Sequence, residues 1–184
     1  MVATTETPLC KLAIKYGADK APQLGKHTYT PYYYDLLNKK RRSIRKVLEI
    51  GIGEGASLRM WRDFFPNAKI YGADYRAGSL IKENRIESIL CDQRKGEHLV
   101  SLVKKIGSNI DLVIDDGSHR SRDQVFTCLT LMPLLKKQVV YVIEDVSESS
   151  IVERLLKYDI EMPKIDQSKR RYDNRLVVVR HKFA

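Results

Sequence analysis

The sequence lacks the features of several large classes of protein. It contains three cysteines, Cys10, Cys91 and Cys128, with no CxxC spacing, so neither a disulfide framework nor a zinc site is predicted. No apolar run approaches the about 18–20 residues that span a bilayer. Residues 1–7 lack the basic and apolar segments of a secretory signal. These absences predict a cytoplasmic protein that does not cross a membrane.

Acidic residues are outnumbered by basic ones. The chain has 33 Lys and Arg against 23 Asp and Glu, a formal net charge of +10, which favours an anionic partner or substrate. The basic residues gather at Lys39–Arg42, Arg45–Lys46, Lys136–Lys137 and Lys169–Arg171. Nucleic-acid sites usually interleave aromatic and basic side chains, and here only Tyr172 follows such a cluster. Nucleic acid is therefore disfavoured, and the clusters also fit solvated helix ends.

Hydrophobic residues make up 43% of the 184 residues, enough for the core of a single domain, 1–184. Residues 1–46 are polar and rich in tyrosine, and they predict helices over Leu9–Tyr16 and Pro31–Asn38. Residues 47–184 have a different pattern, in which short apolar runs alternate with helical periodicity. This second part predicts an α/β core.

The apolar runs predict strands over Lys46–Ile50, Lys69–Ala73, Glu87–Cys91, Asp111–Ile114 and Val139–Ile143. Helices are predicted over Ala56–Phe65, Ser79–Asn84, Gly96–Ile106, Ser121–Leu135 and Ser150–Tyr158. A C-terminal hairpin is predicted from Ile160–Asp166 and Leu176–Arg180, joined by the polar stretch 167–175. Strands that are apolar on both faces and separated by helices form parallel sheets. The predicted fold is a Rossmann-like, doubly wound, mostly parallel seven-stranded sheet with an antiparallel C-terminal hairpin.

A glycine-rich turn follows the first strand and leads into a helix. It reads Glu49-Ile-Gly51-Ile-Gly53-Glu-Gly55-Ala56, and glycines there let the backbone approach a ligand at a helix N-terminus. The string from Gly51 to Ala56 also fits G-x-G-x-x-A, so a dinucleotide site is an alternative. Asp74 ends the second strand, where an acid can accept both ribose hydroxyls.

Acidic residues end every one of the first five predicted strands. Asp92 and Gln93 follow the third strand, Asp115 and Asp116 the fourth, and Glu144 and Asp145 the fifth. Some of these acids could cap the following helices. Neighbouring strands would bring Asp116, Glu144 and Asp145 together, and their oxygens favour Mg²⁺, or Mn²⁺ or Ca²⁺, over zinc. His119 lies three residues after Asp116, within reach as a base. A surface histidine among hydrogen-bonded acids is the alternative.

Together these motifs resemble the class I S-adenosylmethionine-dependent methyltransferases. More narrowly, the chain resembles the Mg²⁺-dependent macrolide and rhamnosyl sugar O-methyltransferases. The resemblance lies in residues 15–20, 27–31, 47–62, 114–119 and 141–145. Its most specific strings are DDGSH at 115–119 and IEDV at 143–146.

The resemblance implies a role for each matched residue. Glu49 belongs to the cofactor motif, and the turn at Gly51, Gly53 and Gly55 would hold the methionyl part of S-adenosylmethionine. Asp74 would bind the ribose, Asp92 and Gln93 would lie by the adenine, and Asp115 would contact the methionyl amino group. Residues 1–46 would form a helical lid, with Tyr29 and Thr30 folded over the cofactor. Asp116, Glu144 and Asp145 would bind Mg²⁺, and His119 would be the general base.

The implied reaction is O-methylation of a hydroxyl group on a sugar or small natural product. The macrolide enzymes carry an N-terminal region that this chain lacks, and their aromatic segment after the fifth strand is replaced by Ser147-Glu-Ser-Ser150. The identity of the acceptor, including whether it is negatively charged, is therefore left open. A homodimer that completes the pocket is also left open. The alternatives are a catechol-type O-methyltransferase, a nucleic-acid methyltransferase and a non-catalytic S-adenosylmethionine-binding protein.

Overall fold

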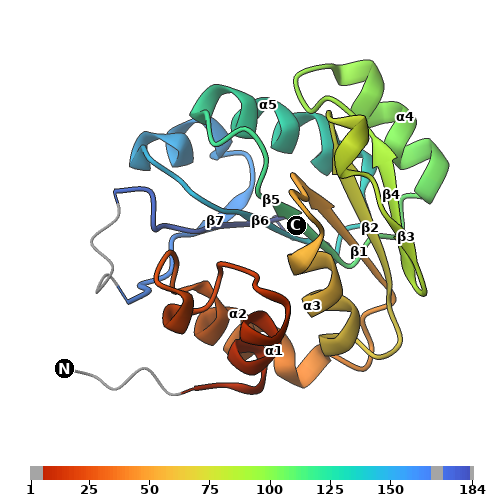
Figure 1. The fold of residues 1–184 in the computed structure, drawn as a ribbon. Helices are drawn as coiled ribbons and strands as arrows, with labels where there is room; N and C mark the ends of the chain where they lie inside the picture. Colours follow the sequence, from red (N-terminus) through yellow and green to blue (C-terminus); the bar gives the residue numbers. More distant parts are fainter. Residues whose placement is uncertain (1–5, 167–171, 183–184) are drawn as a thin grey trace.

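The computed structural model describes residues 6–166 and 172–182. A central sheet is covered on one face by α1, α2 and α3 and on the other by α4 and α5 (Figure 1). The α-helices are α1 (Pro8–Tyr16), α2 (Tyr29–Leu37), α3 (Ala56–Phe64), α4 (Gly96–Ile106) and α5 (Ser121–Leu131). The strands are β1 (Lys46–Ile50), β2 (Lys69–Asp74), β3 (Lys82–Glu83), β4 (Ile86–Leu90), β5 (Leu112–Asp115), β6 (Val140–Ile143), β7 (Asp159–Glu161) and β8 (Val177–Arg180). Short 3₁₀ segments are η1 (Pro22–Leu24), η2 (Asn38–Lys40), η3 (Ala77–Ser79), η4 (Met132–Leu134) and η5 (Ser149–Leu155).

The order of the strands across the sheet is β3-β4-β2-β1-β5-β6-β8-β7. Strands β4, β2, β1, β5 and β6 are parallel, while β8 runs antiparallel to both β6 and β7. The chain moves outward from β1 in one direction through β2 and in the other through β5, so the crevice between β1 and β5 is the switch point where such sheets bind ligands. The doubly wound fold and the antiparallel C-terminal strands are thereby confirmed.

Two hydrophobic cores lie on the two faces of the sheet. The core under α4 and α5 contains Leu99, Leu102 and Val113, and the core under α1, α2 and α3 contains Trp61 and Phe64. Burying one large apolar side chain contributes about 1.5–3 kcal/mol. The strands are therefore held from both sides, which positions their carboxyl ends.

The N-terminal segment is part of the second core. Tyr29 and Tyr33 on α2 are fully buried, and the Tyr33 ring packs edge-on against Trp61 at 5.1 Å. Thr7 caps α1 by accepting a hydrogen bond from the Cys10 N–H, and Gly17 ends α1 in the left-handed conformation. This part of residues 1–46 is packed rather than loosely laid on the surface, and its function as a lid stays a prediction.

The predicted strand count was wrong by one. Residues Ser79–Asn84 were expected to be helical, but the chain forms η3 and then β3, which pairs antiparallel with β4. Arg85 has a φ of 59° in the turn between these strands, and the Ser88 hydroxyl bonds both backbone groups of Ile81. The tight turn and this side chain fix a hairpin, so the sheet has eight strands within the described residues.

Two predicted helices differ from the structure. The helix expected over Ser121–Leu135 ends at Leu131, because Pro133 has no N–H to donate and the chain continues as η4. The helix expected over Ser150–Tyr158 is the 3₁₀ segment η5, whose β-branched Ile151 and Val152 favour a regular helix less.

The remaining predicted elements agree with the structure to within two residues at most ends, although β7 is shorter than Ile160–Asp166. The basic run Lys169–Arg171 lies outside the described residues. Among those that are described, no helix combines the length and apolar character needed to cross a bilayer.

Candidate active site

The glycine turn after β1 meets the end of β5 at the switch point. The Asp116 N–H donates to the Ile50 carbonyl at 2.8 Å. Gly51 has a φ of +80°, and a Cβ there would lie 2.1 Å from the Asp116 carbonyl oxygen. Gly53 also has a positive φ, but nothing would lie within 4 Å of its Cβ. The first glycine thus lets two strand ends approach each other, while Gly53 leaves room for a ligand.

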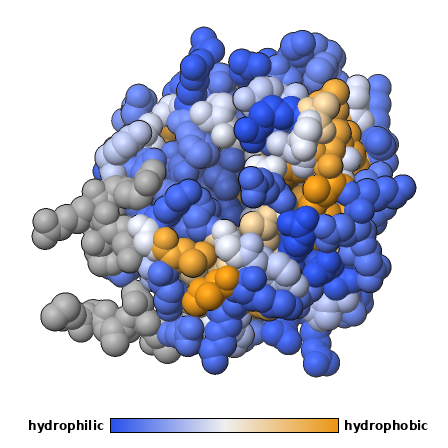
Figure 2. All heavy atoms as spheres, viewed as in Figure 1, coloured by the Kyte–Doolittle hydropathy of each residue, from blue (hydrophilic) through white to orange (hydrophobic). Residues whose placement is uncertain are grey.

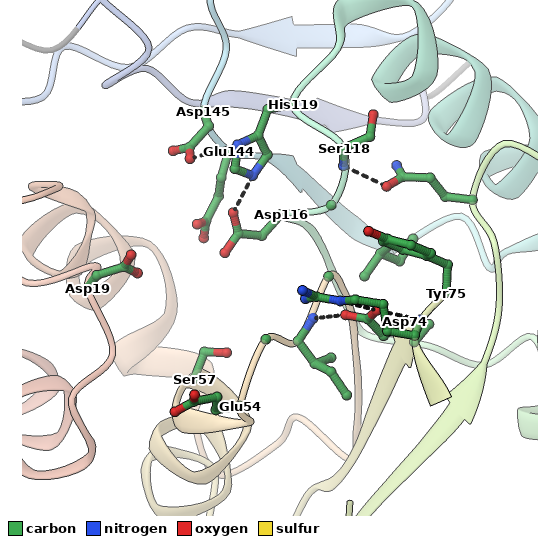
Figure 3. A pocket seen from close by; sticks show the side chains of 18 of the residues that line it. Asp19, Glu54, Ser57, Asp74, Tyr75, Asp116, Ser118, His119, Glu144 and Asp145 are labelled. Carbon is green, nitrogen blue, oxygen red and sulfur yellow. Dashed lines mark hydrogen bonds and ion pairs between the residues drawn. The ribbon is translucent and has the colours of Figure 1, made fainter. Parts of the chain in front are cut away.

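A cavity of about 710 Å³ opens over these strand ends. The surface is hydrophilic and hollowed between the N-terminal helices and α5 (Figure 2). Asp74 and Tyr75 lie at one end of the cavity, and Asp116, His119, Glu144 and Asp145 gather at the other (Figure 3). Of the predicted cofactor residues, Asp74, Asp92 and Gln93 line this cavity together with Gly51 and Gly53, and so do the three predicted metal ligands.

Asp74 is buried where β2 ends, and its carboxylate orders the loops around it. One oxygen accepts from the Ile52 N–H at 3.2 Å, and the other accepts from the Arg76 N–H at 2.9 Å. The first bond ties the glycine turn to the end of β2. Asp74 thus lies at the cavity with its position fixed by backbone donors.

Tyr75, which the sequence analysis did not single out, follows Asp74 in the cavity wall. Its side chain is large and 63% exposed. The guanidinium groups of Arg76 and Arg94 lie 5.5 and 5.8 Å from its ring centroid, within the range of cation–π attraction. The arrangement gives the cavity a flat aromatic surface beside two cations. Its position directly after a strand end was the signal that could have identified it.

Asp92 and Gln93 both line the cavity, but they have different environments. The Arg94 guanidinium pairs with the Asp92 carboxylate and, against some burial, lowers its pKa to about 2. The Gln93 amide donates to Asp115 at 3.0 Å and accepts from the Ser118 N–H at 2.7 Å. Gln93 therefore holds the loop that carries the DDGSH string.

Asp115 is fully buried and does not line the cavity. It accepts hydrogen bonds from Gln93 and from the Tyr141 hydroxyl, at 3.0 Å each, and burial raises its pKa to about 7 despite them. Its side chain lies on the core side with Gln93 and Tyr141, whereas that of Asp116 lines the cavity, and the predicted contact with the methionyl amino group stays a prediction.

The end of the cavity where Asp116, His119, Glu144 and Asp145 gather is called the acidic end below. Within it, the side chains of Asp116, His119 and Asp145 form a close group. His119 Nε2 lies 3.2 Å from Asp116 Oδ1, and His119 Nδ1 lies 3.4 Å from Asp145 Oδ2. One ligand atom from each of the three residues falls within 4.8 Å of the others. His119 and Asp145 have positive φ values of 55° and 54°, a conformation that non-glycine residues rarely adopt and that occurs at functional sites.

Glu144 lies beside this group, and two other side chains hold its carboxylate. Oε2 is 2.5 Å from the Lys20 ammonium and Oε1 accepts from the Tyr33 hydroxyl at 2.6 Å. Lys20 also contacts Asp116 at 2.6 Å and Glu49 at 3.4 Å. Its side chain is 2% exposed. The structure therefore joins Glu144 to Asp116 through an internal lysine.

The chain fixes Lys20 from both sides. Its carbonyl accepts the N–H groups of Tyr29 and Thr30 at the start of α2, and the N–H of Ala18, two residues earlier, donates to the Ala13 carbonyl of α1. Although burial opposes its charge, the three carboxylates raise the pKa of Lys20 well above its usual range. Burial also raises the pKa of Glu49 to about 7, despite the nearby lysine. No periodicity in the sequence could indicate such a contact.

The charges of the acidic end fit a divalent cation. Four carboxylates, those of Glu49, Asp116, Glu144 and Asp145, surround Lys20 and His119. The hydrogen bond to Asp116 outweighs burial and raises the pKa of His119 to about 9, so the imidazole compensates negative charge at neutral pH. Oxygen-rich donor sets of this kind suit Mg²⁺, Mn²⁺ or Ca²⁺.

Tyr29 and Thr30, which were expected to fold over the cofactor, do not line the cavity. Tyr29 is fully buried, and its hydroxyl donates to Asp145 Oδ1 at 2.6 Å. Thr30 is also buried, beside Cys10 at 3.1 Å. The cavity is instead bordered from this side by residues 17–20 and by Lys26 and His27. Tyr29 therefore acts as a support for Asp145, and His27 stacks on the Tyr29 ring at 4.8 Å.

A family model described as FtsJ-like methyltransferase matches residues 32–174. A curated relative, the 8-demethyl-8-alpha-L-rhamnosyl tetracenomycin-C 2'-O-methyltransferase of Streptomyces olivaceus, is 38% identical over 148 residues, which are 77% of this chain and 38% of that protein. The Mycinamicin VI 2''-O-methyltransferase of Micromonospora griseorubida is 38% identical over 144 residues, 74% of this chain and 35% of that protein. The chain thus spans between 35% and 38% of the length of these two relatives.

Solved structures show the same architecture. The MycE methyltransferase from the mycinamycin biosynthetic pathway, in complex with Mg, SAH and mycinamycin VI, superposes with a TM-score of 0.79 at 25% identity. The superposition covers 97% of this chain and 54% of that one. A second MycE structure, in complex with Mg and SAH, has a TM-score of 0.78 at 26% identity and covers 96% of this chain and 55% of the other.

Proposed function

Because the chain belongs to the FtsJ-like methyltransferase family, we propose that it transfers a methyl group from S-adenosylmethionine to a hydroxyl oxygen of a glycosylated small molecule. The observation that carries this proposal is the single cavity with Asp74 and Tyr75 at one end and the Asp116–His119–Asp145 group at the other. The names of the relatives and the bound groups in the MycE structures support the cofactor and a sugar acceptor.

The Asp74 end would hold the cofactor. The Asp74 carboxylate would accept the ribose hydroxyls, as an acid at the end of the second strand does in this fold class. The exposed Tyr75 ring offers a stacking surface for the adenine, with Asp92 and Gln93 nearby in the wall. The open side of Gly53 leaves space for the methionyl part. When bound, the cofactor supplies a methyl group already activated by its sulfonium.

The acidic end would hold Mg²⁺ and orient the acceptor. Asp116 and Asp145 are the proposed ligands with the best geometry, since one oxygen of each lies within 4.8 Å of the other and of a His119 nitrogen. Glu144 remains a proposed ligand, and its coordination requires Lys20 to give up Oε2. When bound, the cation lowers the pKa of a coordinated hydroxyl group.

His119 is the proposed general base. It lies at the edge of the cavity with 43% of its side chain exposed, and both ring nitrogens face carboxylates. At neutral pH the imidazole must first lose the proton that Asp116 stabilises, and positive charge bound at the carboxylates would favour this loss. His119 could then accept the hydroxyl proton while the oxygen attacks in line.

The proposal also covers the cellular compartment and the oligomeric state of the protein. All three cysteines are buried and unpaired, which supports a reducing, cytoplasmic environment. A homodimer would complete the acceptor side of the pocket. Light scattering of the purified protein measures the oligomeric state directly.

Calorimetric titration with S-adenosylhomocysteine tests the proposed cofactor, with NADH as the control ligand. We expect micromolar binding of the first and none of the second. Asp74→Ala should weaken the binding at least tenfold, while Asp35→Ala, which removes an exposed carboxylate on α2, should leave it unchanged. Preference for NADH, or no binding of either compound, would refute the proposal.

A further inference from the structure

A second hollow lies on the outer side of His119. It has a volume of about 600 Å³, and His119 lines both this hollow and the main cavity. Under the proposed function, the methyl donor occupies the main cavity and the accepting oxygen lies at His119. The rest of the acceptor then extends towards this second hollow. The residues that line the hollow therefore indicate which chemical groups the acceptor carries.

Arginine dominates these walls. Arg120 and Arg122 lie at the start of α5, and Arg154 comes from η5, which packs against α5 (Figure 1). Arg120 and Arg154 are exposed, and neither forms an ion pair within the described part of the chain. Arg122 is 77% exposed and contacts Asp123 at 3.3 Å. One acidic residue, Glu148, also lines the hollow, which leaves an excess of positive charge.

Further donors at the same place lack partners. Helix α5 begins at Ser121 with no described side chain capping its N-terminus. The N–H groups of Asp123 and Gln124 donate to the Arg120 carbonyl, so the free N–H groups at this helix start are those of Ser121 and Arg122. A helix N-terminus and unpaired guanidinium groups both favour a carboxylate or phosphate group.

We propose that this hollow binds an anionic group, a carboxylate or a phosphate, carried by the methyl acceptor. The inference rests on the proposed function for the role of the group as part of an acceptor, whereas the anion site itself rests on the hollow. The guanidinium groups of Arg120 and Arg154 would bind the anion, and the acceptor hydroxyl would lie towards His119. An acidic sugar or a sugar phosphate has both groups on one small scaffold.

NMR titration of the ¹⁵N-labelled protein, saturated with S-adenosylhomocysteine, tests the site. The probes are inorganic phosphate, glucose 1-phosphate, glucuronate and, as the neutral control, glucose. We expect the anions to shift the backbone amides of Ser121 and Arg122, and glucose to leave them unchanged. A stronger response to glucose 1-phosphate than to glucuronate would identify phosphate as the preferred anion, and the reverse would identify carboxylate.

The double variant Arg120→Gln/Arg154→Gln should raise the dissociation constant for the preferred anion at least tenfold. Its matched control is Arg42→Gln/Arg45→Gln, which removes the same charge from exposed side chains elsewhere. Equal weakening in both double variants would attribute binding to net charge and overturn the inference, as would the absence of amide shifts in the unaltered protein. Failure of S-adenosylhomocysteine to bind would refute the proposed function instead, and the same titration without that ligand would still test the anion site.

Discussion

Single residues at the acidic end depend on one another through charge. Lys20 is the internal cation of three carboxylates and has almost no contact with solvent. Removing one partner of a buried ion pair leaves the other partners charged in a medium that solvates them poorly. Lys20 is therefore a structural requirement of the site as well as a neighbour of the proposed metal ligands.

Replacing this lysine by methionine, Lys20→Met, should lower the free energy of unfolding by about 3–5 kcal/mol, measured by urea denaturation in the presence of a chelator. Lys26→Met provides the control, since Lys26 is 61% exposed and pairs with an exposed Asp19; a loss below about 1 kcal/mol is expected there. Equal losses in the two variants would contradict the internal ion-pair network.

Two glycines of the same turn should respond differently to alanine. Gly51→Ala would place a Cβ 2.1 Å from a backbone oxygen, at a φ of +80°, so the two strand ends must separate; we expect a loss of about 2–4 kcal/mol. Gly53→Ala meets nothing within 4 Å, and its conformational strain alone should cost about 1–2 kcal/mol. Urea denaturation of both variants makes the comparison. Equal destabilisation would show that contact with Asp116 is not what requires Gly51.

His119→Ala should leave the binding of S-adenosylhomocysteine unchanged and abolish methyl transfer once an acceptor is known, because the side chain lies at the opposite end of the cavity from Asp74. Calorimetry and a transfer assay measure the two properties separately. Normal turnover in this variant would exclude His119 as the base.

At the scale of elements, helices α1 and α3 are joined by a polar contact. Asp63 on α3 accepts from the Tyr16 hydroxyl at 2.5 Å and from Lys15 at 3.1 Å, both at the end of α1. Partial burial opposes the charge of Asp63, but these hydrogen bonds prevail and lower its pKa to about 2. The contact thus holds the N-terminal segment, and with it Lys20, against the core.

This contact predicts a dependence of stability on pH. The pKa of Asp63 is lower in the folded chain than its ordinary value of 3.8. The contribution of Asp63 to the free energy of unfolding is therefore present above about pH 4 and is lost as the pH falls through about 2. Asp63→Asn should therefore lose about 1 kcal/mol of stability at neutral pH, after solvent screening, and the difference from the unaltered protein should shrink towards pH 2. Urea denaturation between pH 2 and 6 tests this, with Asp35→Asn as an exposed control; a difference independent of pH would contradict it.

The strands and helices of the sheet core were predictable because their buried positions produce apolar runs and helical periodicity in the sequence. β1 and α4 have the bounds expected from apolar runs and helical periodicity. The errors fell at η3, β3, η4 and η5, which are all short segments. At η3 and β3, a turn residue and a side-chain bond to the backbone decide the conformation. Arg85 and Ser88 exert such local control, and composition alone does not reveal it.

At the scale of the whole molecule, ligand binding should stabilise the fold, because the cavity is built from both halves of the sheet and from residues 17–20. S-adenosylhomocysteine at one hundred times its dissociation constant adds about 2.7 kcal/mol, which corresponds to a rise of about 5–10 °C in the Tm of a domain of this size. Differential scanning calorimetry measures the rise, and Asp74→Ala should abolish most of it. A large rise that persists in this variant would place the ligand elsewhere.

The sequence by itself determined the parallel sheet, the glycine turn and the row of acids at the strand ends, because burial on both faces and the geometry of a strand–helix turn restrict the residues at those positions. Only the tertiary structure decided which of these residues meet. Asp115 and Asp116 are neighbours in the sequence, but Asp115, the last residue of β5, is buried in the core, whereas Asp116, the first residue after the strand, lines the cavity. Lys20 lies 124 residues from Glu144 in the sequence, yet the two form an ion pair. Packing of α1 and α2 against the sheet creates that contact, which no local pattern encodes.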